Sequence, residues 1–286
     1  MTRPHDLPTL SSVFGMLALW LPMQTLSAQD GDVEMLRSLL PKFAASLNST
    51  PPVIDAQLLA AVDAVIAHRD PTAAPTAEFL DAVRRLADVC YHGGRTEQGL
   101  KWLQPIDRAL ASATDPLERH RVAASLGWLL QRVGRIDDAE ARLRLAHDEL
   151  TSRPAADPLA LEVRRALTAI LSKQSKWREC LPLAEQLVAA DKATNAEADV
   201  LTQDLARLGC CHHFLGQRQP SYDAYAERLA IARRTWPATD SRVLDAIDDL
   251  AAPTAQLGDY RAAYELIREA LSVRERTQPP DTEKIL

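Results

Sequence analysis

The feature that most constrains the fold of this chain is an internal repeat. Five leucines recur at spacings of 40, 41, 41 and 42 residues, namely Leu86, Leu126, Leu167, Leu208 and Leu250. Small residues follow each leucine at the same three offsets. One residue later stand Ala87, Gly127, Thr168, Gly209 and Ala251. Eight later stand Gly94, Gly134, Ser175, Gly216 and Gly258, and thirteen later Gly99, Ala139, Cys180, Ser221 and Ala263. A fixed period of roughly 20 to 50 residues is the signature of a repeat architecture.

The physical interpretation of each unit is a helix, a tight turn and a second helix. Small side chains are needed where two helix backbones cross closely, and glycine adopts the left-handed conformation that often ends a helix. The leucine and the apolar residues at helical spacing around it form a face that one hairpin cannot bury alone. Five stacked hairpins share that face, so the repeat predicts an all-α superhelical solenoid.

Composition supports an all-helical, globular chain. Of its 286 residues, 47% are hydrophobic, which suffices for a sizeable core, while only 5% are aromatic and 10 are glycine. The formal net charge of -6 argues against a general nucleic-acid binder, because such proteins need a basic balance. We therefore predict no nucleic-acid partner and look for binding in local patches.

The last unit carries a family resemblance. The stretch from Leu257 through Gly258, Tyr260 and Ala263 to Ala270 resembles the tetratricopeptide repeat family. The period of about 42 residues resembles its kinesin-light-chain subtype, over residues 76–281. This resemblance implies a right-handed superhelical solenoid of helix-turn-helix units that binds proteins or peptides. Pro105, Pro182 and Pro253 are expected to kink or shorten their helices.

Residues 1–28 differ from the rest of the chain. Arg3 precedes an apolar run from Val13 to Met23, and the small pair Ser27-Ala28 follows, as in a secretory signal peptide. The alternative is a buried or anchoring amino-terminal helix. The run is too short to span a bilayer, so we expect export to the periplasm or the extracellular space, with no stable membrane insertion after cleavage. Residues 29–75 are predicted to form a helical cap, with helices at 33–47 and 54–69, and residues 76–286 the repeat array.

No constellation of residues predicts catalysis, a cofactor or a metal site. In the segment from Cys210 to His213, only the two end residues share a helix face, and two further ligands are missing. His212 is better explained as a packed core residue. Cys90 and Cys180 also fall at core-facing positions, so reduced cysteines are expected, although an even count of four leaves disulfides open.

Three functions remain compatible with these patterns. The first is an exported scaffold that binds a peptide or protein partner in its concave groove. The second is the sensor or regulatory arm of a larger multidomain protein whose carboxyl-terminal effector, such as a protease, lies outside this sequence. The third, an enzyme or metal protein in its own right, has no motif in its favour, and we predict that the chain is not an enzyme.

The resemblance also implies where a partner binds. In this family the first helix of each hairpin lines the concave face, through positions six and three before the small residue and one, four and five after it. On this sequence those offsets select a basic, aromatic set of candidate groove residues: Arg84, Tyr91, Arg121, Trp128, Arg132, Arg165 and Lys173. The fifth unit supplies Asp245 and Asp248 instead. The set predicts an acidic peptide or carboxyl terminus as partner, since arginine suits bidentate carboxylate contacts. The alternative is that Trp128 packs against a neighbouring hairpin and the arginines are merely solvated.

Overall fold

The computed structural model describes residues 28–47, 54–69, 75–110 and 116–277, and these form twelve helices. The first two are α2 (Ala28–Leu47) and α3 (Ala56–His68). Five hairpins follow: α4 (Ala77–His92) with α5 (Thr96–Leu110), α6 (Pro116–Arg132) with α7 (Ile136–Leu150), α8 (Pro158–Lys173) with α9 (Trp177–Thr194), α10 (Ala198–Phe214) with α11 (Arg218–Thr235), and α12 (Ser241–Gln256) with α13 (Tyr260–Thr277).

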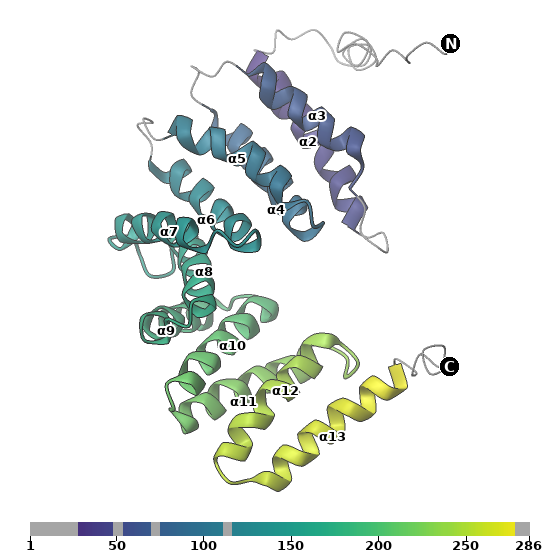
Figure 1. Cartoon of the computed structure of the whole chain (residues 1–286), viewed down its shortest axis with the longest axis vertical. Coiled ribbons are helices and arrows are strands. Elements are labelled where there is room, and N and C mark those ends of the chain that lie inside the picture. Colours follow the sequence, from purple (N-terminus) through teal and green to yellow (C-terminus); the bar gives the residue numbers. More distant parts are fainter. Residues whose placement is uncertain (1–27, 48–53, 70–74, 111–115, 278–286) are drawn as a thin grey trace.

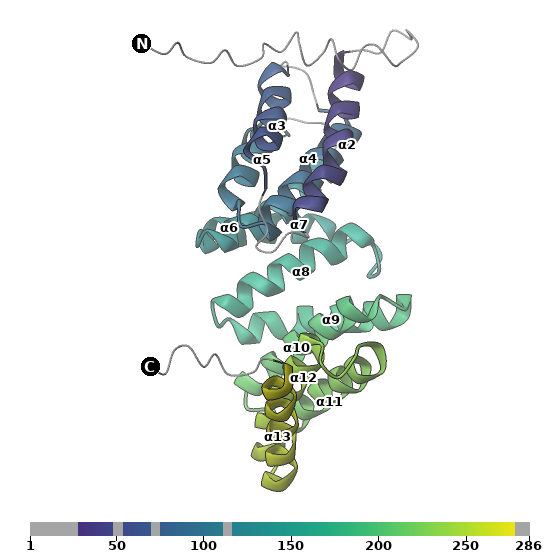
Figure 2. The same ribbon diagram turned by 90° about the vertical axis from the view of Figure 1, so that its right-hand side faces the viewer.

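The helices stack as a solenoid in chain order, from α2 and α3 at one end to α13 at the other (Figures 1 and 2). Within the described ranges, each helix packs against its neighbours in sequence or against the helix two positions along. The first helices α4, α6, α8, α10 and α12 therefore form one continuous row, and the second helices flank it. The predicted all-α repeat fold is confirmed.

The turns explain why small residues recur. The turn glycines Gly94, Gly134, Gly216 and Gly258 have φ between 70° and 93°, in the left-handed region, and Ser175 adopts φ 59° in the third unit. A close approach between the two helices of a hairpin also explains why the residue after each repeated leucine is small. A Cβ atom at Gly209 would lie 2.9 Å from ring atoms of Tyr225, so only glycine lets α10 and α11 pack this tightly.

The apolar core divides into two main parts. A large cluster of buried side chains runs from Val33 on α2 to Cys211 on α10. A second runs from Tyr225 on α11 to Val273 on α13. A small cluster of Val188, Leu205 and Ile231 lies between them. We call α2–α9 the N-terminal half and α10–α13 the C-terminal half.

Some details differ from expectation or lie outside the described residues. Pro105, Pro182 and Pro253 do not end their helices, since α5, α9 and α12 each continue past the proline. Pro105 and Pro182 are exposed, so their rings face solvent. The proposed signal peptide lies outside the described residues except for Ala28, which begins α2. No helix in the described part of the chain combines the length and apolarity needed to cross a membrane.

Candidate functional site

The candidate groove residues lie on α4, α6 and α8, which are consecutive members of the row of first helices. The chain reverses in the turn of each hairpin and again in the connection to the next one, so these three first helices run in the same direction. Their carboxyl-terminal ends therefore lie along one side of the row. The structure divides the seven candidates into two groups: three arginines in the body of the row, paired with acidic residues, and four residues near the helix ends.

Arg84 ties three first helices together. Its Nη2 donates to Glu162 Oε1 of α8 at 2.6 Å, and its Nε donates to Ser125 Oγ of α6 at 3.2 Å. The Arg84 side chain is only 13% exposed. The guanidinium therefore holds α4, α6 and α8 together, and its charge is already matched by a carboxylate.

Asp88 lies one turn beyond Arg84 on α4. It is exposed, but it lies on the row of first helices, where surrounding protein displaces water. This desolvation raises the pKa of Asp88 to about 6, and the nearby Arg84 opposes the rise only in part. Asp88 is thus an acidic group in the predicted groove that changes charge near neutral pH.

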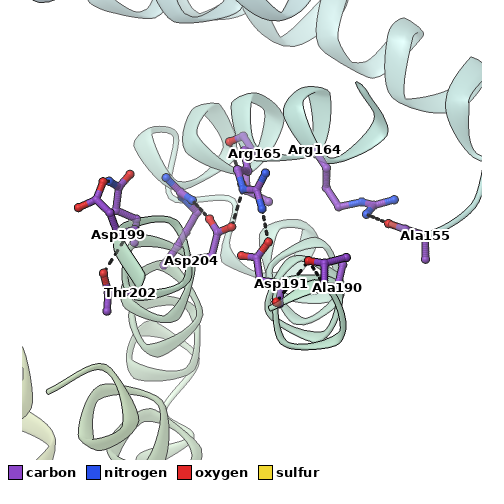
Figure 3. Close-up of polar contacts among 12 residues, drawn as sticks. Ala155, Arg164, Arg165, Ala190, Asp191, Asp199, Thr202 and Asp204 are labelled. Atoms are coloured by element: carbon purple, nitrogen blue, oxygen red, sulfur yellow. Dashed lines mark hydrogen bonds and ion pairs between the residues drawn. The ribbon is translucent and has the colours of Figure 1, made fainter. Parts of the chain in front are cut away.

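Arg121 and Arg165 are also paired. Arg121 contacts Glu118 on its own helix. Arg165 Nε donates to Asp204 Oδ2 at 2.7 Å, and the same guanidinium contacts Asp191. Figure 3 shows Arg165 of α8 between Asp191 of α9 and Asp204 of α10.

This network joins the two halves of the molecule. Arg207 Nη1 also donates to Asp204, Oδ1, at 2.6 Å, and both carboxyl side chains are only 1% exposed. We call Arg165, Asp191, Asp204 and Arg207 the acidic junction. Burial and the neighbouring Asp204 raise the pKa of Asp191 to about 6, although Arg165 opposes the shift. Arg165 therefore stabilises buried acids of its own chain.

The other four candidates, Tyr91, Trp128, Arg132 and Lys173, lie in the carboxyl-terminal turns of α4, α6 and α8, and we call them the basic rim. The Arg132 guanidinium lies 5.0 Å from the centre of the Tyr91 ring, a cation–π contact between neighbouring units. Trp128 is half-buried and packs against the large core cluster. Arg132 and Lys173 are exposed, and no carboxylate among the described residues forms an ion pair with either.

The fourth unit adds an exposed aromatic residue, Phe214, that is not among the seven candidates. Phe214 is 58% exposed and stacks on Trp177, with ring centroids 4.4 Å apart and planes at 8°. Phe214 stands at the same offset after the small residue as Arg132 and Lys173, so the repeat register was the signal that could have identified it. In the fifth unit, Asp248 accepts from Arg274 Nη2 at 2.5 Å, so it is paired as well.

His212 and the cysteines, which resembled a possible metal site in the sequence, pack within the fold. His212 is buried, and its Nδ1 lies 2.5 Å from Gln217 Oε1, as a packed histidine should be. The four cysteines are free, and burial raises the pKa of the Cys90 thiol to about 12. No cluster of three or more potential metal-ligating side chains occurs in the ranges that the structure describes.

Known protein families and curated proteins offer no match to this sequence, whereas solved structures do. A Podosopora anserina protein with nearly identical TPR-like repeats, named for the kinesin light chain, aligns with TM-score 0.60 and 18% identity over 70% of this chain and 96% of its own. BtubC from P. vanneervenii aligns with TM-score 0.60 and 13% identity, over 89% of this chain and 94% of its own. A Rap protein in complex with Competence and Sporulation Factor aligns with TM-score 0.60 and 11% identity, over 92% of this chain and 70% of its own. The chain thus has the tetratricopeptide-type fold, whose members generally mediate protein–protein interactions and are generally not enzymes.

Proposed function

We propose that this tetratricopeptide-type chain is a binding scaffold that holds an acidic segment of a protein or peptide along its basic rim. The observation that carries this proposal is the exposure of Arg132, which lies over the Tyr91 ring, and of Lys173 one repeat along, in contrast to the paired Arg84, which faces a carboxylate of its own chain.

The spacing of the rim suits an extended acidic segment. Arg132 ends α6 and Lys173 ends α8, so the two cations stand one repeat apart. Packed helices lie about 10 Å apart, and carboxylates two or three residues apart in an extended peptide are separated by roughly 7 to 10 Å. The planar guanidinium of Arg132 can bind one carboxylate through two N–H groups, and the ammonium of Lys173 can pair with the next carboxylate. Tyr91 and Trp128 add rigid ring surface of the kind enriched at binding hot spots.

A related fold supports the same type of function. The Rap protein whose structure resembles this chain was solved with Competence and Sporulation Factor bound. That complex shows that a solenoid of this shape can hold a partner, and the chemistry of the basic rim suggests that the partner of this chain is acidic.

A fluorescently labelled glutamate-rich peptide is the probe for a first test. Its affinity should fall at least tenfold in an Arg132→Glu/Lys173→Glu variant and should weaken as salt is raised, because the pairing is between exposed charges. Arg178→Glu/Arg234→Glu, which changes two exposed arginines on the second helices α9 and α11, is the charge-matched control and should lose far less. Equal affinities in all variants, with circular dichroism showing each one folded, would rule out the rim.

We also propose that the mature protein is exported. Cleavage after Ala28 would leave α2 intact from its second residue, because that helix begins at Ala28. Amino-terminal sequencing of the protein from its own host should then give Gln29 first, whereas an intact Met1 or Thr2 in a cytoplasmic fraction would contradict export.

A further inference from the structure

Two consecutive arginines of α8 have very different surroundings. Arg165 contacts two carboxylates of its own chain, whereas Arg164 reaches only a backbone carbonyl (Figure 3). The Arg164 Nη1 donates to Ala155 O at 3.5 Å, the long limit of a hydrogen bond, and the Arg164 Nε is buried with no partner. Arg164 is only 7% exposed, and no carboxylate of the described ranges forms an ion pair with it. It is therefore a buried cation without a counter-charge.

The repeat register shows that this position normally belongs to the apolar core. Arg164 stands four residues before Thr168, the small residue of the third unit. The equivalent residues of the other four units are all apolar and buried, namely Val83, Ala123, Leu205 and Ile247. The third unit thus places a permanent positive charge where every other unit buries an apolar side chain.

The neighbouring basic groups add to the uncompensated charge. Burial and the adjacent Arg165 lower the pKa of Arg164, yet a guanidinium stays charged at neutral pH. Burial and the charge of Arg164 likewise lower the pKa of His147 on α7, and Asp148 opposes that shift only in part. A buried charge without a partner is costly to a fold. A negative group beside Arg164 would remove that cost.

An anion can approach Arg164 from the surface. Ala155, whose carbonyl Arg164 contacts, belongs to the connection between α7 and α8, and residues 151–156 of this connection are exposed. The guanidinium therefore lies just beneath an exposed loop. A ligand that enters there replaces one long hydrogen bond, and it breaks no ion pair of the described ranges.

We propose that Arg164 anchors a phosphate-binding site beneath the connection between α7 and α8. A guanidinium binds phosphate oxygens through two parallel N–H groups. A phosphate group carries roughly 1.5 to 2 negative charges at neutral pH, which suits a site with two basic groups, Arg164 and His147. The phosphate is either free or attached to a serine of a partner protein, because the guanidinium recognises the same oxygens in both.

Isothermal titration of the full-length chain with sodium phosphate at constant ionic strength tests the site. Saturable binding of one phosphate per chain is expected, and Arg164→Met should weaken it at least tenfold. Methionine fills the space of the arginine stem with an apolar side chain, so the variant should fold and its thermal midpoint without phosphate should not fall. Arg178→Met, which changes an exposed arginine of α9, is the matched control and should bind phosphate as the unmodified chain does.

Two further measurements identify the source of the phosphate and keep the test decisive. An acetylated glycine–phosphoserine–glycine peptide that binds more tightly than free phosphate would indicate a phosphorylated partner, and weaker binding would indicate the free ion. If Arg164→Met does not fold, Arg164→Lys keeps the charge without the two parallel N–H groups and should still bind phosphate more weakly.

Three results would overturn the proposal. They are the absence of saturable binding by both probes, equal phosphate affinity in the unmodified chain and the Arg164 variants, or a lower thermal midpoint of folded Arg164→Met without phosphate. The last would show that the chain itself already satisfies the charge. The Arg132→Glu/Lys173→Glu variant should keep its phosphate affinity, so the outcome does not depend on peptide binding at the basic rim.

Discussion

The two halves of the solenoid use the same repeat but are held together differently. In the N-terminal half, the first helices pack closely, one core runs from α2 to α10, and Arg84 links α4 to α8 across α6. The C-terminal half has a second core on α11, α12 and α13, and it joins the rest through Cys211 of α10 in the large core cluster, a small apolar cluster and the acidic junction. The comparison shows that Arg84 and Arg165 on the row of first helices connect repeats and are matched by acids of their own chain. Of the seven candidates, Arg132 and Lys173 at the helix ends form no ion pair with a carboxylate of the described ranges.

A substitution in the acidic junction should lower the unfolding free energy more than a substitution in an exposed ion pair. Arg165→Ala leaves Asp191 and Asp204 buried without their shared guanidinium, which should cost about 3 kcal/mol of unfolding free energy. We expect urea denaturation followed by circular dichroism to separate into two transitions, because the coupling between the halves is weakened. Arg233→Ala removes an exposed pair with Glu269 and should cost less than about 1 kcal/mol. Equal losses of unfolding free energy in the two variants would show that the junction stabilises the chain no more than an exposed ion pair does.

Equivalent residues of the two halves should differ strongly in their response to truncation. Leu143 is fully buried in the second unit, and its counterpart in the fifth, Ile267, is 54% exposed. Leu143→Ala should destabilise the chain by about 2 to 5 kcal/mol, because it leaves a cavity in the core. Ile267→Ala should change stability by less than about 0.5 kcal/mol in dilute solution. Thermal denaturation of both variants measures the contrast, and similar shifts would show that the repeat register is wrong.

The raised pKa of Asp191 predicts a pH dependence that belongs to the junction. A carboxyl group whose pKa is higher in the folded chain stabilises the fold when protonated, and that contribution is lost as pH rises through the folded value. The junction should therefore weaken by about 1 to 3 kcal/mol between pH 4 and pH 6, since the pKa is raised from 3.8 to about 6. Comparison of Asp191→Asn with the unmodified chain in urea at several pH values isolates this effect. A difference between the two that does not change with pH would contradict it.

The smallest predicted effect on stability concerns the turn between α8 and α9. Ser175 adopts the left-handed conformation that glycine occupies in the other four turns, including Gly216. Ser175→Gly should stabilise the chain by up to about 1 kcal/mol, and Gly216→Ser should destabilise it by a similar amount. Thermal melts of the two variants should shift in opposite directions. Shifts of the same sign would mean that turn conformation does not decide these positions.

The sequence predicted the helices and their turns because close backbone contacts and left-handed turns restrict which residue types can stand at fixed positions of the repeat. A small residue such as Gly209 is needed where two helix backbones cross closely, and glycine is favoured where φ is positive, as in four of the five turns, so both recur at fixed offsets. The expected shortening at Pro105 and Pro182 was wrong, because both residues face solvent and their helices continue past them.

The charge pairing in the groove could not be predicted in the same way. Repeat offsets tell which helix face a side chain occupies, but not which residue of another unit it meets. Arg84 pairs with Glu162, 78 residues away and two units along, across the intervening helix α6. The repeat offsets placed the candidates on the row of first helices, but they could not separate the paired Arg84 from the open Arg132.

Hydrogen exchange of the full-length chain, with and without the glutamate-rich peptide, tests most directly the claim that binding belongs to the open rim of the N-terminal half. The account predicts slower amide exchange in the last turns of α4, α6 and α8, at residues 88–92, 128–132 and 169–173, and no change at residues 251–256 of α12. Protection at α12 instead, or protection spread evenly over both halves, would contradict it.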